Sequence, residues 1–581
     1  MSTITAPMVG TTLQALTAPP AREVERTLLV CADAPWHRVE HAAPEGDRVP
    51  LLSALRPERG WPHWLLRVPM RWCGDSRFER LADVDWQVEA FVPPALGQPG
   101  EPWRFSLDVT RFPPPAPRAG RAAPEDLPLE MNGLLLLGLY LEPRAVAMEG
   151  ERQGVMHELD REELRQQVDG ALEELLALPP HRWAHGFVPS PGEPDAQDRA
   201  AAQADGAEEA EGVCFVVAAC QYPPGILDVS PGCELDPAQA GPALAAMARM
   251  HRFARSTTLG RRCSLVLFAG DQIYADASGG LADSRSGVER YARSYNEFKA
   301  GPARLLPPTV ARVVHGIDDH EIIDNWEPGH RDGNGPWFQV ARQAAWDHRW
   351  EAGARVGGPE TLWHDFDWRG ASFFIADARC EREARRVANW STARMWSAVQ
   401  RDAFAEWLGR SAGRRRFMLC GSLPLPRRRT TAEHPASSLR SDAWDGYPHS
   451  LHELLGEIWR ARAAGLTFLS GDEHRSGWVS AEISAVDGEA APVRIHSVHS
   501  SALYAPWPFA ITAAEELAAP EAFEFDGPDG RRLRCVVSAW DDHPGDGFAV
   551  LRVRGSAVEL WFDRAGAPVD DGETPHATLP R

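Results

Sequence analysis

The chain has 581 residues and a formal net charge of −21, with 44% hydrophobic and 25% charged residues. This length exceeds what one hydrophobic core usually serves, so we expect at least two domains in a folded chain. The negative charge disfavours nonspecific binding to nucleic acid or anionic lipid, since both attract basic surfaces.

The cysteines and the N-terminal residues indicate the cellular compartment. Nine cysteines are scattered without a spacing typical of disulfide frameworks or zinc sites, which favours a reducing environment. The first 30 residues lack the basic and apolar regions of an export signal. The longest apolar run, 133–141, is far shorter than the roughly 20 residues that cross a bilayer. We therefore expect a cytoplasmic protein without a membrane partner.

Residues 1–188 favour a small β-rich domain. Strand-like runs occupy 26–32, 63–72, 86–92 and 103–112, and one amphipathic helix is predicted over 161–178. The segment 189–212 is rich in Ala, Glu, Asp, Gly and Pro and has few large apolar side chains. Such a segment buries too little apolar surface to offset the conformational entropy lost on ordering, so we interpret residues 189–212 as a linker.

Residues 213–581 follow a different pattern, in which apolar strands alternate with helix-like segments. The strands are predicted within 212–220, 264–271, 311–319, 372–379, 415–421 and 465–474, and a hairpin is predicted around Arg554, Gly555 and Ser556. Near-continuous apolar strands indicate an α/β sheet buried on both faces. Such sheets bind ligands outside the carboxyl ends of their strands, where most of these runs end in polar residues.

The run SLVLFAGDQIYAD, 264–276, ends in Asp271, with Tyr274 three residues later. If the chain enters a helical turn there, the carboxylate and the phenol face the same way and can meet one ion. A cation such as Fe(III) stabilises the phenolate form of tyrosine. Asp276 can support the same site. The alternative is a capping aspartate beside a packed tyrosine.

A second cluster, HGIDDHEIIDNW, covers 315–326. Asp318 and Asp319 repel each other unless a cation or a proton intervenes, and His320 can supply a proton near neutral pH. This density of charge after an apolar strand indicates a functional site. A solvated acidic loop is the alternative.

The third cluster, LSGDEHRSG, covers 469–477. In extended backbone, Asp472 and His474 project to the same face, which suits ligands of neighbouring ions. A turn with an aspartate cap is the alternative.

Two further strand ends carry candidates. Arg379 can hold phosphate oxygens while Asp377 orients it, or the two can form a structural ion pair. Cys220 is a possible thiolate ligand, although a free cysteine is more often simply buried.

The ordered motifs VAACQYPPG, GDQIYAD, GIDDHEIIDNW, FFIADAR, DAWDGYP and LSGDEHRSG together resemble the alkaline phosphatase D (PhoD-like) family of metallophosphatases. The similarity runs from about residue 213 to the C-terminus. It implies a four-layer α/β/β/α sandwich over 213–581, to which the N-terminal β-rich domain is added.

The resemblance also implies a dinuclear metal site. Asp271 matches a bridging aspartate, and Tyr274 matches a tyrosinate that binds iron. Asp319 falls where the wider superfamily has a metal-binding asparagine. Asp472 and His474 match the terminal ligand pair, with aspartate in place of the first histidine, and Cys220 resembles the family's cysteine after the first strand. His320 matches the catalytic histidine. The expected ions are Fe(III) and a divalent ion, which is Ca, Mn, Zn or Mg.

The expected activity is hydrolysis of phosphoric monoesters, diesters or both by a metal-bound hydroxide. Asp271 would bridge the ions, His320 would protonate the leaving group, and Arg379 would hold the phosphate-ester substrate. The alternative is a noncatalytic metal- or ligand-binding protein that keeps the metallophosphatase fold. The sequence leaves the physiological substrate and the oligomeric state open.

Overall fold

The computed structural model divides the chain into two compact units, residues 1–193 with 299–304, and residues 194–298 with 305–581. Before residue 190 it describes 9–13, 26–30, 63–73, 77–81, 87–91, 131–139, 173, 176 and 186–189. After that it describes 213–223, 241–276, 287–300, 302–306, 310, 312–329, 336–348, 361–428, 439–488, 490–500, 502–506, 517, 520–538, 541–570 and 574–581.

The described part of the first unit consists of strands. They are β1 (Val9–Leu13), β2 (Arg26–Val30), β3 (His63–Cys73), β4 (Arg77–Arg80), β5 (Gln87–Phe91), β6 (Met131–Leu139) and β7 (Gly186–Pro189). β1 and β2 pair with each other, and the other five form one antiparallel sheet around β3 and β6. The strands predicted at 26–32, 63–72 and 86–92 are therefore confirmed. The strand predicted at 103–112, nearly all of the helix predicted at 161–178 and the linker after residue 189 lie outside the described residues.

A six-stranded sheet forms the first half of the second unit. Its strands, in spatial order, are β10 (Arg312–His315), β9 (Cys263–Phe268), β8 (Cys214–Ala218), β20 (Gly547–Arg554), β21 (Ala557–Arg564) and β22 (Ala577–Leu579). β8, β9 and β10 run parallel, and the others are antiparallel. The hairpin predicted around Gly555 is confirmed by β20 and β21.

A nine-stranded sheet forms the other half. Its main order is β11 (His364–Trp368), β12 (Ala371–Ile375), β13 (Arg415–Leu419), β14 (Thr467–Ser470), β16 (Val493–His499), β15 (Ser476–Ala485), β18 (Arg532–Val537) and β17 (Glu521–Asp526), and β19 (Asp541–His543) also pairs with β15. β12, β13, β14 and β16 run parallel. All six strands predicted after residue 212 are therefore present.

Two neighbouring residues of β12 show how the layers pack. Phe373 lies 5.4 Å from Phe215 of β8, ring centroid to ring centroid, so the two sheets face each other here. Phe374 points to the opposite face, where Phe404 lies 5.3 Å away on α7. The strand is apolar on both faces because each face is covered, which explains its continuous hydrophobic run.

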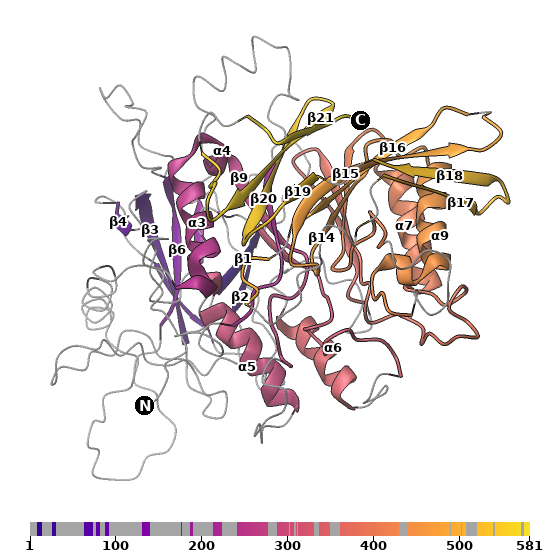
Figure 1. The fold of residues 1–581 in the computed structure, drawn as a ribbon. Helices are drawn as coiled ribbons and strands as arrows, with labels where there is room; N and C mark the ends of the chain where they lie inside the picture. The colour runs from indigo at the N-terminus through magenta and orange to yellow at the C-terminus, as the bar shows by residue number, and fades with distance from the viewer. Residues whose placement is uncertain are drawn as a thin grey trace. The chain divides into compact units, whose positions relative to one another are not determined.

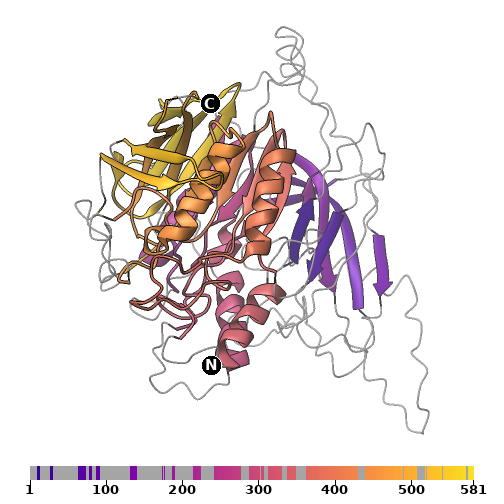
Figure 2. The same ribbon diagram turned by 90° about the vertical axis from the view of Figure 1, so that its right-hand side faces the viewer.

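The described helices occur mainly in the second unit. They are α3 (Pro242–Ser256), α4 (Thr258–Arg262), α5 (Gly287–Ala300), α6 (Pro336–His348), α7 (Ala398–Arg410) and α9 (Pro448–Arg460), with short 3₁₀ turns at Pro302–Leu305 and Trp444–Gly446. α7 and α9 lie side by side against the nine-stranded sheet (Figures 1 and 2). The molecule is thus a mixed α/β protein with several sheets. No helix among the described residues has the length and apolar character needed to span a membrane.

Candidate metal centre

The candidate site lies where parallel strands of both sheets end. Cys220 follows β8 and Asp271 follows β9, and these two loops are joined by a backbone hydrogen bond from Gln221 to Asp271 of 2.8 Å. From the other sheet, the segment after β14 approaches β8 so closely that a Cβ added to Gly471 would lie 2.4 Å from the Cβ of Ala219. Polar residues from six separate strand ends are gathered here because the carboxyl ends of parallel strands share one edge.

The backbone at this edge is unusual. Seven described non-glycine residues have a positive φ, and five of them belong to this site. The five are Cys220 (φ 56°), Asp271 (φ 53°), Asn325 (φ 53°), Asp472 (φ 80°) and His474 (φ 49°). The left-handed region is unfavourable for residues with a Cβ and persists where surrounding contacts enforce it, which is frequent at functional sites.

Two glycines make room for Asp318. A Cβ on Gly270 would lie 2.5 Å from the Cβ of Asp318, and one on Gly421 would lie 2.3 Å from its Cγ. Gly270 also has φ 105°, a conformation that favours glycine. The Asp318 carboxylate is therefore inserted between the loops after β9 and β13.

Three overlapping groups of side chains could each hold a cation. Within each group the donor atoms lie within 4.8 Å of one another. The groups are Cys220, Asp271 and His474; Asp271, Asp319 and His320; and Asp271, Asp318, Asp319 and Asp472. Asp271 belongs to all three, so the arrangement offers adjacent positions that share one carboxylate.

Tyr274 completes the set predicted from the sequence. Its hydroxyl lies 3.2 Å from Nε2 of His474, and its ring lies 5.1 Å from that of Tyr222. The structure thus brings together Cys220, Asp271, Tyr274, Asp319, Asp472 and His474, all buried or nearly so.

The carboxylates of this cluster are electrostatically unfavourable without cations. Burial, reinforced by Asp319, raises the pKa of Asp271 well above its usual value. Burial, reinforced by Asp442 and Asp318, does the same to the pKa of Asp472. Oδ2 of Asp318 is buried and accepts no hydrogen bond from any residue in the described ranges. Oxygen, imidazole, thiol and phenol donors in one place suit a hard cation beside a trivalent or transition metal.

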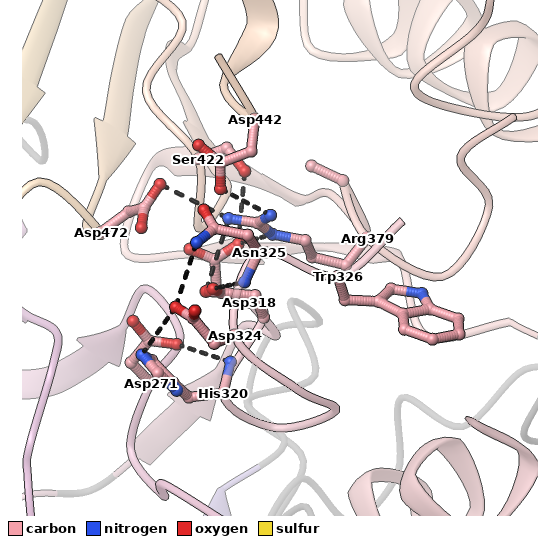
Figure 3. A network of polar contacts seen from close by, with 12 residues as sticks. Asp271, Asp318, His320, Asp324, Asn325, Trp326, Arg379, Ser422, Asp442 and Asp472 are labelled. Atoms are coloured by element: carbon pink, nitrogen blue, oxygen red, sulfur yellow. Dashed lines mark hydrogen bonds and ion pairs between the residues drawn. The ribbon is translucent and has the colours of Figure 1, made fainter. Parts of the chain in front are cut away.

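Arg379 occupies the centre of the acidic cluster (Figure 3). Its side chain is fully buried and forms ion pairs with four aspartates. The partners are Asp318 through Nε, Asp319 at 3.4 Å, Asp442 at 2.9 Å and Asp472 at 3.4 Å. One guanidinium therefore offsets part of the charge of several carboxylates, which leaves a net negative site for metal ions.

His320 lies between the cluster and a further aspartate. Its Nδ1 is 2.8 Å from Oδ1 of Asp276, and its backbone N–H donates to Oδ1 of Asp271 over 3.3 Å. Its ring also stacks on Tyr274 at 4.0 Å. Burial lowers the pKa of His320, but Asp319 and Asp276 outweigh it and raise the pKa well above its usual value. The ring is thus held in one orientation and favoured in its protonated form.

Two expectations about the backbone at this site are wrong. The backbone of Asp271 is left-handed, so no helical turn aligns its side chain with that of Tyr274. Tyr274 instead meets the site through its contact with His474. Asp472 and His474 are also left-handed and not extended, and they enter different donor groups. These turns are stabilised by neighbouring loops, which residue spacing does not reveal.

The structural ion pair between Asp377 and Arg379, the alternative considered for these residues, is absent. Oδ1 of Asp377 accepts the backbone N–H groups of Arg379 at 3.0 Å and of Cys380 at 2.8 Å. The aspartate caps the turn after β12 and leaves the guanidinium to the acidic cluster.

Sequence reasoning missed two important residues. Glu321 accepts backbone N–H groups from Asp271, Ile273 and Asp318, and so ties the loops after β9 and β10 together. Asp442 pairs with Arg379 and lies in the motif DAWDGYP, for which the sequence predicts no role of this carboxylate. The partners of Glu321 are backbone groups, so the sequence carries no signal for them.

The model of the PhoD-like phosphatase family matches residues 238–506. This range contains every candidate residue named above except Tyr222 and Cys220, which lie before it. A comparison with curated proteins found no match. A solved structure titled "Structure of PhoD" aligns with a TM-score of 0.48 and 14% identity, covering 96% of this chain and 85% of that one. Residues 238–506 are thus similar to the PhoD-like phosphatase family.

Proposed function

We propose that the protein is a metal-dependent phosphoric ester hydrolase with a dinuclear site. The family match supports phosphatase activity. The observation that carries the dinuclear site is that three donor groups share the carboxylate of Asp271. A carboxylate common to two positions can bridge two cations, which is the arrangement used to clamp a transferring phosphoryl group.

The donor chemistry suggests how the ligands divide. Cys220, Tyr274 and His474 would hold Fe(III) together with Asp271, because thiolate, phenolate and imidazole suit a transition metal. Asp319 and Asp472 would hold a divalent ion on the other side of Asp271, and Ca, Mn, Zn and Mg all accept carboxylate oxygens. When bound, the two ions would activate water and offset the negative charge of the phosphoryl group.

His320 is the proposed proton donor to the leaving group. The Asp276 carboxylate at 2.8 Å fixes the ring and favours its protonated form, as a general acid requires. Arg379 would contribute positive charge next to the substrate's phosphoryl oxygens while it balances the surrounding aspartates. Phosphate would have to compete with these aspartates for the guanidinium.

Several finer points belong to the same proposal. The opposite orientations of Phe373 and Phe374 support a four-layer α/β/β/α order over 213–581. The sheet around β3 supports a separate β-rich domain before the linker. A cytoplasmic location and a phosphate-ester substrate are part of this proposal. Activity toward both monoesters and diesters is compatible with this donor set.

The replacement Asp271→Asn tests the proposal. It removes the shared negative ligand while nearly preserving its shape, so hydrolysis of chromogenic phosphate mono- and diesters should fall by at least about a hundredfold. Asp563→Asn is a matched control, because Asp563 is also buried and pairs with Arg249 but belongs to none of the three donor groups. Full activity in Asp271→Asn with normal metal content would refute the assignment. An inactive parental protein, reconstituted separately with each candidate metal, would favour a noncatalytic binding role.

A further inference from the structure

Glu473 lies between two proposed ligands but belongs to none of the three donor groups. Its side chain is buried, and its carboxylate pairs with Arg428, Oε1 to Nη2, at 2.5 Å. A buried carboxylate that binds no proposed ion needs another reason to be there, because desolvating it is costly.

The turn that contains Glu473 separates the two ligands. Asp472 and His474 both have left-handed backbone, with φ 80° and 49°. As a result, Asp472 enters the group of four aspartates, whereas His474 enters the group with Cys220. Glu473 therefore lies in the turn whose two neighbouring residues enter different donor groups around Asp271.

Two residues hold Glu473, one at the end of a strand and one in a loop. Its backbone N–H donates to Nε2 of His499 over 3.3 Å, and Nδ1 of the same ring lies 2.9 Å from Oγ of Ser470. His499 is fully buried at the end of β16, so this acceptor belongs to the rigid sheet. Arg428 supplies the second anchor from the segment after β13.

Arg428 also contacts the other side of the acidic cluster. Its Nη1 lies 3.6 Å from Oδ1 of Asp442, whose other oxygen is 2.9 Å from Arg379. The backbone N–H of Arg428 donates to Oδ2 of Asp445 over 2.7 Å, so the arginine is held next to the segment that contains Asp442. Arg428 thus connects the turn at Glu473 with the carboxylates around Arg379.

We propose that Arg428 and Glu473 are positioning residues that hold the Asp472–His474 turn so that one ligand faces each metal ion. The inference rests on the proposed dinuclear site. Partners of metal ligands commonly change metal affinity by roughly 10- to 100-fold when they are mutated. This pair acts through the backbone of the turn and contacts neither ion.

The test measures Mn²⁺ affinity of the 581-residue chain by competition with a chromogenic chelator. Arg428→Gln and Glu473→Gln should each weaken binding by roughly tenfold or more. Arg428→Lys keeps the charge but loses the planar guanidinium, so its Mn²⁺ affinity should lie between those of Arg428→Gln and the parental protein. Thermal unfolding of the metal-free variants shows which of them fold. If Arg428→Gln does not fold, the affinity of Arg428→Lys is compared with the parental value instead.

The adjacent arginine provides a matched control. Arg427 pairs with Glu521 through Nε at 2.6 Å, and its guanidinium lies over the ring of Phe523 at 4.0 Å. Arg427→Gln therefore removes a comparable ion pair one residue away without touching the Asp472–His474 turn. It should leave Mn²⁺ affinity within about twofold of the parental value, since the effects of changes at sites that share no partner are usually independent.

A double-mutant cycle separates positioning from general damage. The double variant Arg428→Gln/Glu473→Gln should bind Mn²⁺ no more weakly than the worse single variant, because both changes remove the same interaction.

Parental affinity in the single variants, or a loss equal to that of Arg427→Gln, would overturn the inference. Loss of affinity in a protein that hydrolyses no ester would refute only the proposed function. Full hydrolysis with unaltered affinity in the variants would refute only the positioning role, and a parental chain that binds no metal would refute both.

Discussion

At the scale of single residues, the candidate site is defined by backbone conformation as much as by residue type. Cys220, Asp271, Asp472 and His474 all adopt the left-handed region, which is rare for residues with a side chain. Contacts from neighbouring strand ends outweigh this local preference, so the four side chains point into one space. The sequence predicts which residue types gather, because each follows an apolar strand. It does not predict these turns, because they depend on contacts across the two sheets.

The charges of these residues make metal binding dependent on pH. The pKa values of Asp271, Asp472 and Tyr274 are all raised, chiefly by burial, so the metal-free site retains protons above the usual pKa of each group. A cation displaces these protons, and its affinity should therefore rise with pH. We expect Mn²⁺ to bind at least about tenfold more tightly at pH 8 than at pH 6.

Calorimetric titration checks this prediction. The titration is performed in two buffers with different ionisation enthalpies. The apparent binding enthalpy should differ between them, because protons released by the site are taken up by the buffer. Equal enthalpies in both buffers, together with an affinity that does not change with pH, would contradict the assignment of raised pKa values to the ligands.

At the scale of elements, the fold followed from hydrophobic patterning more directly than the site did. All six strands predicted after residue 212 are present, because runs such as SFFIADAR are buried on both faces. Residue spacing failed where the chain leaves regular structure. Asp472 and His474 illustrate this, since the extended backbone assumed for them ends with β14 at Ser470.

The segment after β13 offers a test of how closely the strand ends pack. In Gly421→Ala, the new Cβ would lie 2.3 Å from Cγ of Asp318, so this aspartate or the loop must move. Such overpacking costs about 1–3 kcal/mol, and we also expect weaker metal binding. The measurement is urea unfolding, combined with the chelator assay.

Gly409→Ala is the control for this prediction. Gly409 lies in α7, and a Cβ there would meet no heavy atom of another residue within 4 Å. Because alanine favours the helix, this variant should be stabilised by up to about 1 kcal/mol. A Gly421→Ala protein as stable as the parental one would show that Asp318 is not packed tightly between the two loops.

At the scale of the whole molecule, two sheets each contribute half of the candidate site. The six-stranded sheet supplies Cys220, Asp271 and Asp319, whereas the nine-stranded sheet supplies Arg379, Asp472 and His474. The proposed ligands of one ion therefore come from segments about 250 residues apart, such as Cys220 and His474. A hydrogen bond from the Asp472 N–H to Sγ of Cys220, at 3.4 Å, joins these two segments. No local motif encodes such a meeting, and only the ordered series of motifs pointed to it.

The most direct test of the dinuclear site is elemental analysis of the purified protein together with its visible absorption spectrum. The account predicts two metal ions per chain, one of them iron. It also predicts a charge-transfer band from iron-bound Tyr274 that disappears in Tyr274→Phe, while the variant retains its fold. A parental protein with at most one ion per chain, or an iron-loaded protein whose visible spectrum is unchanged in Tyr274→Phe, would contradict it.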